Sequence, residues 1–335
     1  MTLKTMNYLP SIEKEIQRQI SRLNEPLTSS LHEMLTYHLG WSGENADPKT
    51  RGKRIRPLFL LLSCSACGGD WKPALPAAAA VELVHNFSLI HDDIQDNSEK
   101  RRGRDTVWAK WGIPQAINAG DALFILSSQA LFDLVPDFSH EIVSRAANIL
   151  NSACLNLTRG QFLDIYYEKK SDLSLEGYWS MVSGKTAALL SACCALGSLL
   201  GNCDQATLDA YGSFGHYLGL AYQVHDDYLG IWGESRLTGK SSHSDLVSGK
   251  NSLPILYGLG KGGPFARRWA EAPIRADEVA DLSEQLAAEG ARLFVQETAD
   301  QMTDMAMQSL RIANPKGKAG EQLIELAKNL LNRDS

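Results

Sequence analysis

Two clusters of carboxylates stand at the ends of apolar stretches of this sequence. The first, His91–Asp96, contains three aspartates and ends the apolar run Ala77–Ile90. On a helix, Asp92 and Asp96 would lie about 40° apart in projection, so the two side chains would share one face. Their like charges would destabilise the helix by a few tenths of a kcal/mol. For a single cluster of this kind, solvation of the charges at a helix end would be a sufficient explanation. The alternative is a bound cation that compensates the negative charge.

The second cluster repeats this arrangement. Asp226 and Asp227 end another apolar helical run, Tyr217–Val224. Gln223 precedes Asp226 by three residues and would face the same way on a helix. Two carboxylate clusters that face each other would form an oxygen-lined site, which suits Mg²⁺ held together with substrate phosphates. We therefore predict a magnesium diphosphate site.

Basic segments surround both clusters and predict the cationic half of such a site. Arginine gives forked contacts to phosphate and lysine gives a point charge, although each segment alone would be an ordinary solvated feature. His85 precedes Asp92 by seven residues, so both would lie on one helix face, with a hydrogen-bonded core histidine as the alternative. The basic segments are GKRIRP (52–57), RRGR (101–104), Lys185-Thr186, Gly239-Lys240 and Gly249-Lys250.

The composition predicts an ordinary globular protein with an all-α fold. Of 335 residues, 44% are hydrophobic and 21% are charged, which excludes a disordered, collagen-like or coiled-coil chain. Segments rich in Ala, Leu, Glu, Gln and Lys follow one another, and two-residue alternation is scarce. We therefore expect roughly ten or more helices in one domain that covers residues 1–335, without a convincing sheet. A net charge of -6 provides no basic field for nucleic acid or an anionic membrane.

Export and membrane insertion are not predicted. The N-terminus carries recurring charges instead of an apolar signal core. The longest uncharged stretch, Thr186–Cys203, only reaches the lower length limit of a spanning helix and contains Ser, Gly and Asn, so we expect no transmembrane segment but a buried helix. Cys64-x-x-Cys67 and the pair Cys193-Cys194 lack the further ligands of a zinc site. We expect buried free thiols and a cytoplasmic, reducing compartment.

Six motifs, in order, resemble those of the trans-isoprenyl diphosphate synthases, also called polyprenyl synthetases. They cover about Gly52 to Pro254 and read GKRIRP, VELVHNFSLIHDDIQD, RRGRDTVW, SGKT, YQVHDDYLGIWG and TGKSSHSDLVSGKNSLP. The resemblance implies the isoprenoid synthase fold, a large helical bundle around a central cavity, in a protein that is usually a homodimer. It also implies head-to-tail condensation of isopentenyl diphosphate with an allylic prenyl diphosphate.

The resemblance assigns roles to individual residues. The first aspartate-rich motif is Asp92, Asp93 and Asp96, and the second contains Asp226 and Asp227. About three Mg²⁺ ions would bind the allylic diphosphate through Asp92, Asp96 and Asp226. Further ligands of this diphosphate would be Arg101, Lys185, Thr186 and Lys240, with Lys250 as another candidate. The isopentenyl diphosphate ligands would be Lys53, Arg56, His85 and Arg102, and Gln223 would lie near the reacting centre.

One position departs from the family pattern and leaves alternatives open. Gly230 stands where the second motif often has a third aspartate, so we expect a weaker hold on one metal ion and a mild effect of Gly230→Asp. The segment up to Glu234 loosely resembles the second metal motif of class I terpene synthases. Such an enzyme would not need Lys53, Arg56 and His85. A non-catalytic partner subunit is a third alternative, although such subunits usually lose the first motif.

The product length is predicted from two residues, Phe87 and Ser88, that precede Asp92. Ser88 lies four residues before Asp92, under it on a helix, where a small side chain leaves room. Phe87, by resemblance alone, would form the floor of the product cavity, a combination similar to short-chain geranylgeranyl diphosphate synthases. We expect a C20 product, with C15 as the alternative. Leu126 and Leu131 could share the role of Phe87.

Overall fold

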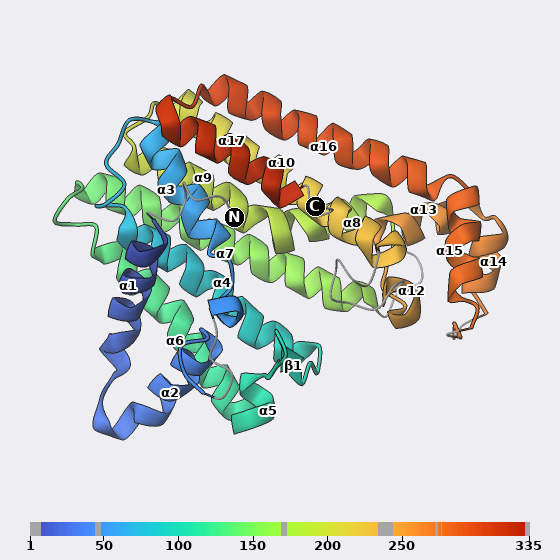
Figure 1. Ribbon diagram of the computed structural model, residues 1–335, viewed down its shortest axis with the longest axis horizontal. Helices are drawn as coiled ribbons and strands as arrows, with labels where there is room; N and C mark the ends of the chain where they lie inside the picture. Colours follow the sequence, from blue (N-terminus) through green and yellow to red (C-terminus); the bar gives the residue numbers. More distant parts are fainter. Residues whose placement is uncertain are drawn as a thin grey trace. The chain divides into compact units, whose positions relative to one another are not determined.

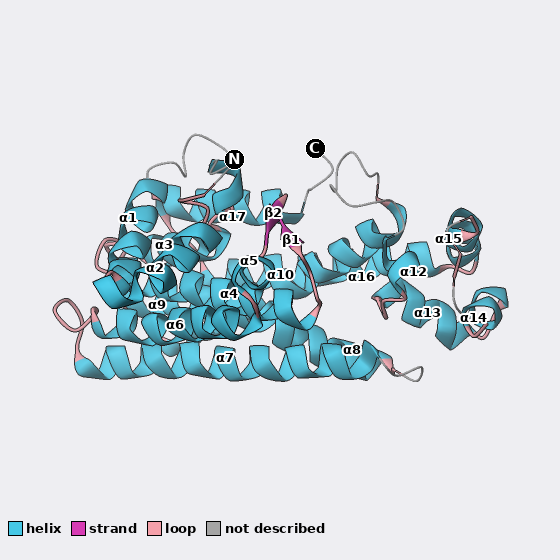
Figure 2. Ribbon diagram, turned by 90° about the horizontal axis from the view of Figure 1, so that it is seen from below, coloured by secondary structure: helices cyan, strands magenta, loops and turns pink. Residues whose placement is uncertain are grey.

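Helices make up nearly all of the regular structure in the computed structural model, as the composition predicts (Figures 1 and 2). The structure describes residues 8–43, 48–168, 173–233, 244–271, 274–275 and 277–331. The chain divides into two units of three segments each. Four of the boundaries fall within α7 (His140–Glu168), α9 (Ala188–Leu200), α10 (Gln205–Trp232) and α17 (Gly317–Leu331). The single domain across residues 1–335 stays a prediction.

The first unit comprises residues 1–151, 193–208 and 315–323. Its α4 packs along α6, and α1 and α3 also pack against α4. Short 3₁₀ turns lie at Ser21–Leu23, Pro26–Thr28 and Pro48–Arg51. The other helices are α1 (Leu9–Ile20), α2 (Ser29–His38), α3 (Ile55–Ala66), α4 (Leu75–Gln95), α5 (Val107–Trp111) and α6 (Ile113–Phe132).

The sequence of α4 explains why the first acidic cluster stands at the end of a rigid element. Pro76 occupies the first turn, where a missing N–H costs nothing, and Ala77–Ala80 are completely buried. The helix ends at Gln95, and Asn97 follows in a left-handed conformation with φ 51°, which is typical of a residue just beyond a helix C-terminus. The carboxylates therefore occupy the last turn of a helix whose other end is fixed in the core.

A hairpin follows α4 and is the β-structure that sequence periodicity misses. β1 (Lys100–Arg101) pairs antiparallel with β2 (Arg104–Asp105), and Arg101 lies opposite Arg104. Arg102 and Gly103 form the turn with φ of 54° and 75°. Two successive residues with positive φ are the feature of type I′ turns, which match the twist of two-residue hairpins. Strands of two residues are too short to show alternation.

The second unit comprises residues 152–192, 209–314 and 324–335. A π-helix at Ser183–Ala187 interrupts the run from α8 into α9. One buried cluster forms around Tyr178, Val224 and Leu253, and another around Phe265 and Leu286. The helices that lie within this unit are α8 (Leu175–Val182), α12 (Ser244–Ser248), α13 (Leu253–Lys261), α14 (Pro264–Trp269), α15 (Val279–Ala288) and α16 (Ala291–Ala313).

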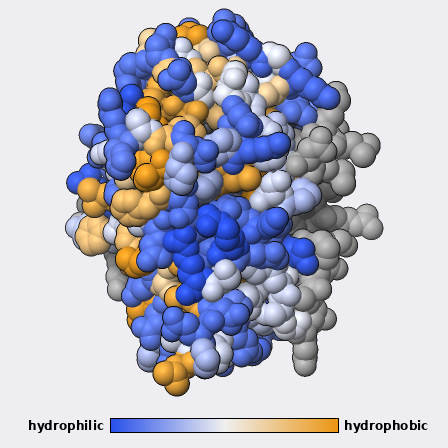
Figure 3. All heavy atoms as spheres, turned by 90° about the vertical axis from the view of Figure 1, so that its left-hand side faces the viewer, coloured by the Kyte–Doolittle hydropathy of each residue, from blue (hydrophilic) through white to orange (hydrophobic). Residues whose placement is uncertain are grey.

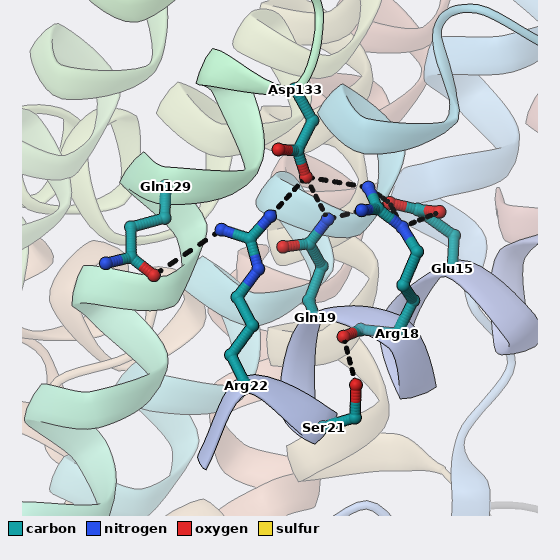
Figure 4. A network of polar contacts seen from close by, with 7 residues as sticks. All are labelled: Glu15, Arg18, Gln19, Ser21, Arg22, Gln129 and Asp133. Carbon is teal, nitrogen blue, oxygen red and sulfur yellow. Dashed lines mark hydrogen bonds and ion pairs between the residues drawn. The ribbon is translucent and has the colours of Figure 1, made fainter.

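A polar network ties α1 to the end of α6 (Figure 4). Asp133, just after α6, accepts hydrogen bonds from Arg18 at 2.6 Å, Arg22 at 2.5 Å and Gln19 at 2.8 Å. Burial raises the pKa of Asp133, but the three donors outweigh burial and lower this pKa below its ordinary value. The network therefore links the C-terminal end of α1 to the C-terminal end of α6.

The cysteine prediction is wrong for one pair. Cys67, after α3, forms a disulfide with Cys203, before α10, within the first unit. The other four cysteines are free and buried, as expected.

One stretch, Leu175–Leu200, is long and apolar enough to cross a membrane, but 72% of its most apolar window is buried inside the structure. This burial agrees with the predicted core helix. The surface carries scattered apolar groups among hydrophilic ones, as Figure 3 shows for one face.

Candidate functional site

The first acidic cluster separates into a buried and an outer part. Asp93 is 2% exposed and accepts hydrogen bonds from Nε of Arg101 at 2.9 and 3.0 Å. Burial raises the pKa of Asp93, and the Arg101 guanidinium opposes this rise. Asp92 is half-buried and Asp96 is exposed at the helix end. Asp92 and Asp96 are therefore the members of this motif that lie at the surface of the unit, as the helical spacing predicts.

The hairpin directs the first two arginines of the RRGR motif to different partners. Arg101, in β1, pairs with Asp93, whereas Arg102, in the turn, donates from NH1 to the carbonyl oxygen of Thr50 at 2.9 Å. Gly52 has a φ of 81°, and a Cβ there would come within 2.9 Å of the Arg102 guanidinium. The positive φ favours glycine at this position of the loop that contacts Arg102.

The predicted isopentenyl diphosphate residues gather in the first unit. Lys53 is exposed in the loop before α3, and Arg56 lies in the first turn of that helix. Burial lowers the pKa of His85 well below its ordinary value, and the charges of Arg56 and Arg102 lower it further. The buried Nε atom of Arg56 has no hydrogen-bond partner among the described residues. Because buried donors are normally satisfied, this group is suited to an anionic ligand.

The second acidic cluster also has one anchored carboxylate. Asp227 is 1% exposed and accepts hydrogen bonds from the Tyr178 hydroxyl at 2.7 Å, the Leu253 N–H at 2.9 Å and Gln223 Nε2 at 2.9 Å. Burial raises the pKa of Asp227, and these donors oppose the rise. Asp227 therefore ties α10 to α8 and α13. The neighbouring Asp226 is half-buried on the same helix.

A π-helix places Lys185 and Thr186. Lys185 pairs with Asp164 of α7, and the Thr186 hydroxyl donates to Gln223 Oε1 at 2.8 Å. The elements approach closely, since a Cβ on Gly160 would meet the backbone nitrogen of Lys185 at 2.1 Å. π-helical turns occur frequently at functional sites. Sequence reasoning missed Asp164, because a lone carboxylate on an amphipathic helix gives no signal.

A pocket in the second unit collects the residues that surround Asp227. Burial lowers the pKa of Lys250, but the carboxylates of Asp227, Asp245 and Asp226 outweigh burial and raise it. Lys250 therefore carries a firm positive charge beside the second motif. The pocket is lined by Asp164, Tyr178, Lys185, Thr186, Gln223, Asp227 and Lys250, among others.

Lys240 and Glu234 lie outside the described residues. The first acidic motif belongs to the first unit and the second motif to the second unit. Within the part of the chain that the structure describes, no group of three or more His, Cys, Asp or Glu side chains could hold a metal ion by itself. Mg²⁺ is usually held by one or two carboxylates together with substrate phosphates, so the outer carboxylates Asp92, Asp96 and Asp226 suit this ion.

Phe87 on α4 contacts the aromatic ring of Phe124, a residue that the sequence pattern does not indicate. The ring centroids of Phe87 and Phe124, on α6, are 5.1 Å apart. His91 lies 5.7 Å from Phe87 and packs on Gly120, where a Cβ would come within 2.2 Å of its ring. Ser88 is buried and donates to the His85 carbonyl at 2.8 Å. Leu126 and Leu131 are buried in the core of the first unit.

Comparisons with known proteins identify the family of this chain. A family model described as polyprenyl synthetase matches residues 45–288. A (2E,6E)-farnesyl diphosphate synthase of Mycobacterium tuberculosis is 36% identical over 346 residues, covering 100% of this chain and 95% of the relative. A geranylgeranyl diphosphate synthase of the same organism is 38% identical, covering 95% of this chain and 90% of the relative. The chain belongs to the polyprenyl synthetase family.

Solved structures show the same relationship. A geranylgeranyl pyrophosphate synthetase of Pyrococcus horikoshii has a TM-score of 0.89 at 32% identity, covering 98% of this chain and 97% of the other. A polyprenyl synthetase of Streptomyces coelicolor has a TM-score of 0.85 at 33% identity, covering 96% and 97%. The predicted isoprenoid synthase fold and the predicted class, a trans-prenyltransferase, are confirmed.

Proposed function

We propose that this protein condenses isopentenyl diphosphate head-to-tail with an allylic prenyl diphosphate to form a short-chain product, C20 with C15 as the alternative. The observation that carries the proposal is the set formed by the cationic Arg56 and Arg102 with the buried His85, in the same unit as the outer carboxylates Asp92 and Asp96. An enzyme that joins two diphosphates needs one such set for each. The similarity to the farnesyl and geranylgeranyl diphosphate synthases supports this assignment.

The allylic diphosphate would bind to the acidic motifs through Mg²⁺. Asp92, Asp96 and Asp226 would hold the ions, about three by family resemblance, and the metal would neutralise negative charge on the departing diphosphate. Lys185, Thr186, Lys240 and Lys250 would add further positive or donor groups. Arg101 would reach this diphosphate from its position beside Asp93. The anchored carboxylates Asp93 and Asp227 would hold their helices in place.

The residues of this chain support the reaction by binding and by shielding. Arg56, Arg102, Lys53 and His85 would fix the diphosphate of isopentenyl diphosphate, so that its double bond is oriented toward the allylic carbon. Once the allylic C–O bond ionises and diphosphate departs, the isopentenyl double bond attacks the allylic cation, and the new cation loses a proton to the departing diphosphate. Gln223 would lie near the reacting centre, held by Thr186 and Asp227. Apolar side chains must exclude water, which would quench the cation.

The ring of Phe87 would end the cavity for the growing chain. Its contact with Phe124 supports this role, because two packed rings form a wall that a single flexible side chain does not. Buried Ser88 leaves space in front of this wall.

A homodimer is part of the proposal. Ile113, Ile117, Ile125 and Phe132 of α6 are between 43% and 67% exposed. Four exposed apolar side chains on one helix are of the kind that protein interfaces cover. We also propose a cytoplasmic location.

The test is to incubate the purified protein with Mg²⁺, isopentenyl diphosphate and farnesyl diphosphate, and to analyse products by mass spectrometry before and after phosphatase treatment. A C20 alcohol that appears only after phosphatase treatment would support the proposal. A hydrocarbon or alcohol released without phosphatase, with isopentenyl diphosphate unconsumed, would instead indicate a terpene synthase. A protein that is inactive alone but active with a second chain would indicate a partner subunit.

A further inference from the structure

Arg54 stands between two proposed isopentenyl diphosphate ligands, Lys53 and Arg56, yet it forms buried ion pairs of its own. The Arg54 side chain is only 2% exposed. Its Nη1 donates a hydrogen bond to Glu82 Oε1 at 2.9 Å, and its Nε donates one to Glu13 Oε1 at 2.6 Å. A guanidinium whose charge is matched by two carboxylates is poorly suited to bind a phosphate. Arg54 therefore has a different role from its neighbours.

Glu82 is the carboxylate that these arginines share. It lies on α4, one turn before His85, is 4% exposed, and also accepts a hydrogen bond from Asn86 at 3.1 Å. Arg56 lies two residues after Arg54, and its buried Nε has no hydrogen-bond partner among the described residues. The charge of Glu82 opposes the lowering of the pKa of Arg56 and of Arg102 by burial. A buried carboxylate without a partner is strongly unfavourable, so Glu82 would pair with one of these arginines if Arg54 were missing.

The backbone conformation at Arg54 is unusual and accompanies its ion pairs with Glu13 and Glu82. Its φ of 48° and ψ of 38° are left-handed, a conformation that residues other than glycine rarely adopt. The Arg54 carbonyl accepts the Leu58 N–H at 3.2 Å and so begins α3. The residue thereby joins α3 to Glu13 of α1 and Glu82 of α4, two helices that pack together in the first unit (Figure 1).

We propose that Arg54 is a positioning residue of the isopentenyl diphosphate site: it holds Glu82 in a buried ion pair and so leaves Arg56 and Arg102 available to the diphosphate. This inference rests on the proposed function. Removal of Arg54 would turn Glu82 into an internal competitor for Arg56. Removal of the charges of both Arg54 and Glu82 would eliminate this competition for Arg56.

The test compares Arg54→Met, Glu82→Gln and the double variant, with KM measured separately for isopentenyl diphosphate and farnesyl diphosphate. Arg54→Met should raise the KM for isopentenyl diphosphate on the order of 10- to 100-fold and leave the KM for farnesyl diphosphate nearly unchanged. The double variant should recover much of this loss, and Glu82→Gln alone should not raise either KM. A reduced folded fraction lowers the apparent kcat but not a KM, so instability alone cannot produce this pattern.

Arg268→Met in the second unit is a matched control, because Arg268 likewise pairs with a carboxylate, Glu278. It should change neither KM. An equal rise of both KM values in Arg54→Met, or a double variant no better than the single one, would overturn the inference alone. A wild-type protein that consumes no isopentenyl diphosphate would overturn the proposed function as well.

A milder variant covers the case in which Arg54→Met does not fold. Arg54→Lys keeps a positive charge near Glu82 but loses the guanidinium that contacts Glu13 and Glu82 together, so it weakens the hold on Glu82. A rise in the KM for isopentenyl diphosphate alone, smaller than that of Arg54→Met, would support the inference, and two unchanged KM values would overturn it.

Discussion

The carboxylate of Asp245 lies against the backbone of Gly230, so closely that a Cβ at Gly230 would come within 2.5 Å of Asp245 Oδ2. Asp245 belongs to α12 and is 7% exposed. The Asp245 carboxylate therefore occupies the space into which a side chain at position 230 would project.

This contact contradicts the expectation that Gly230→Asp has a mild effect. The new side chain would collide with Asp245 and place two carboxylates together, so we predict a loss of stability of about 1–3 kcal/mol or more and a large loss of turnover. Chemical denaturation and a prenyl transfer assay would measure both effects.

A matched control separates this collision from the ordinary effect of replacing a helical glycine. Gly260, on α13, has no atom within 4 Å of an added Cβ, so Gly260→Ala should be neutral or slightly stabilising. Gly230→Asp combined with Asp245→Gly should recover part of the activity. Normal activity of Gly230→Asp alone would contradict the role of this contact.

The two aspartates at the end of α4 should respond differently to substitution. Asp92→Ala should lower turnover on the order of 10²- to 10³-fold with an unchanged melting temperature, because it would remove a metal ligand at the helix surface. Asp93→Asn should instead lower the free energy of unfolding by roughly 1–3 kcal/mol, because it would break the ion pair with Arg101. Parallel kcat and thermal unfolding measurements test this division, and an active Asp92→Ala would argue against the metal site.

Product length should depend on both rings of the Phe87–Phe124 pair. Phe87→Ala and Phe124→Ala should each yield products longer than C20, because either change opens the wall behind Ser88. Leu126→Ala is the control: it should lower stability by about 2–5 kcal/mol without changing the product, since Leu126 is in the core. Mass spectrometry of dephosphorylated products provides the readout, and unchanged products from both phenylalanine variants would refute the wall.

The sequence was sufficient for the helical fold and for the residues whose spacing defines a helix face, such as Asp92 and Asp96. The roles that the motifs assign to Arg56, His85 and Arg102 stay predictions. The sequence could not reveal partners that lie far apart in the chain. Asp164, Asp245 and Phe124 are ordinary members of amphipathic or polar segments, and only tertiary packing places them beside Lys185, Gly230 and Phe87.

The stability of the protein should fall as the pH decreases from neutral, because of His38. Burial lowers the pKa of His38 from 6.5 to about 3, and the charges of Arg101 and Arg102 contribute to this change. Between these values the unfolded chain binds more protons than the folded protein, so the free energy of unfolding rises with pH. The contribution of His38 is complete above its unfolded pKa and is lost as the pH falls toward its folded pKa.

Urea unfolding near pH 7.5 and near pH 5 should therefore show a decrease toward lower pH, of at most about 1.4 kcal/mol per pH unit for each such histidine. His85 acts in the same direction, since its pKa is also lowered. His38→Gln should reduce the slope, whereas His140→Gln, at an exposed position, should preserve it. An unchanged slope in His38→Gln would show that this histidine does not remain neutral inside the folded protein.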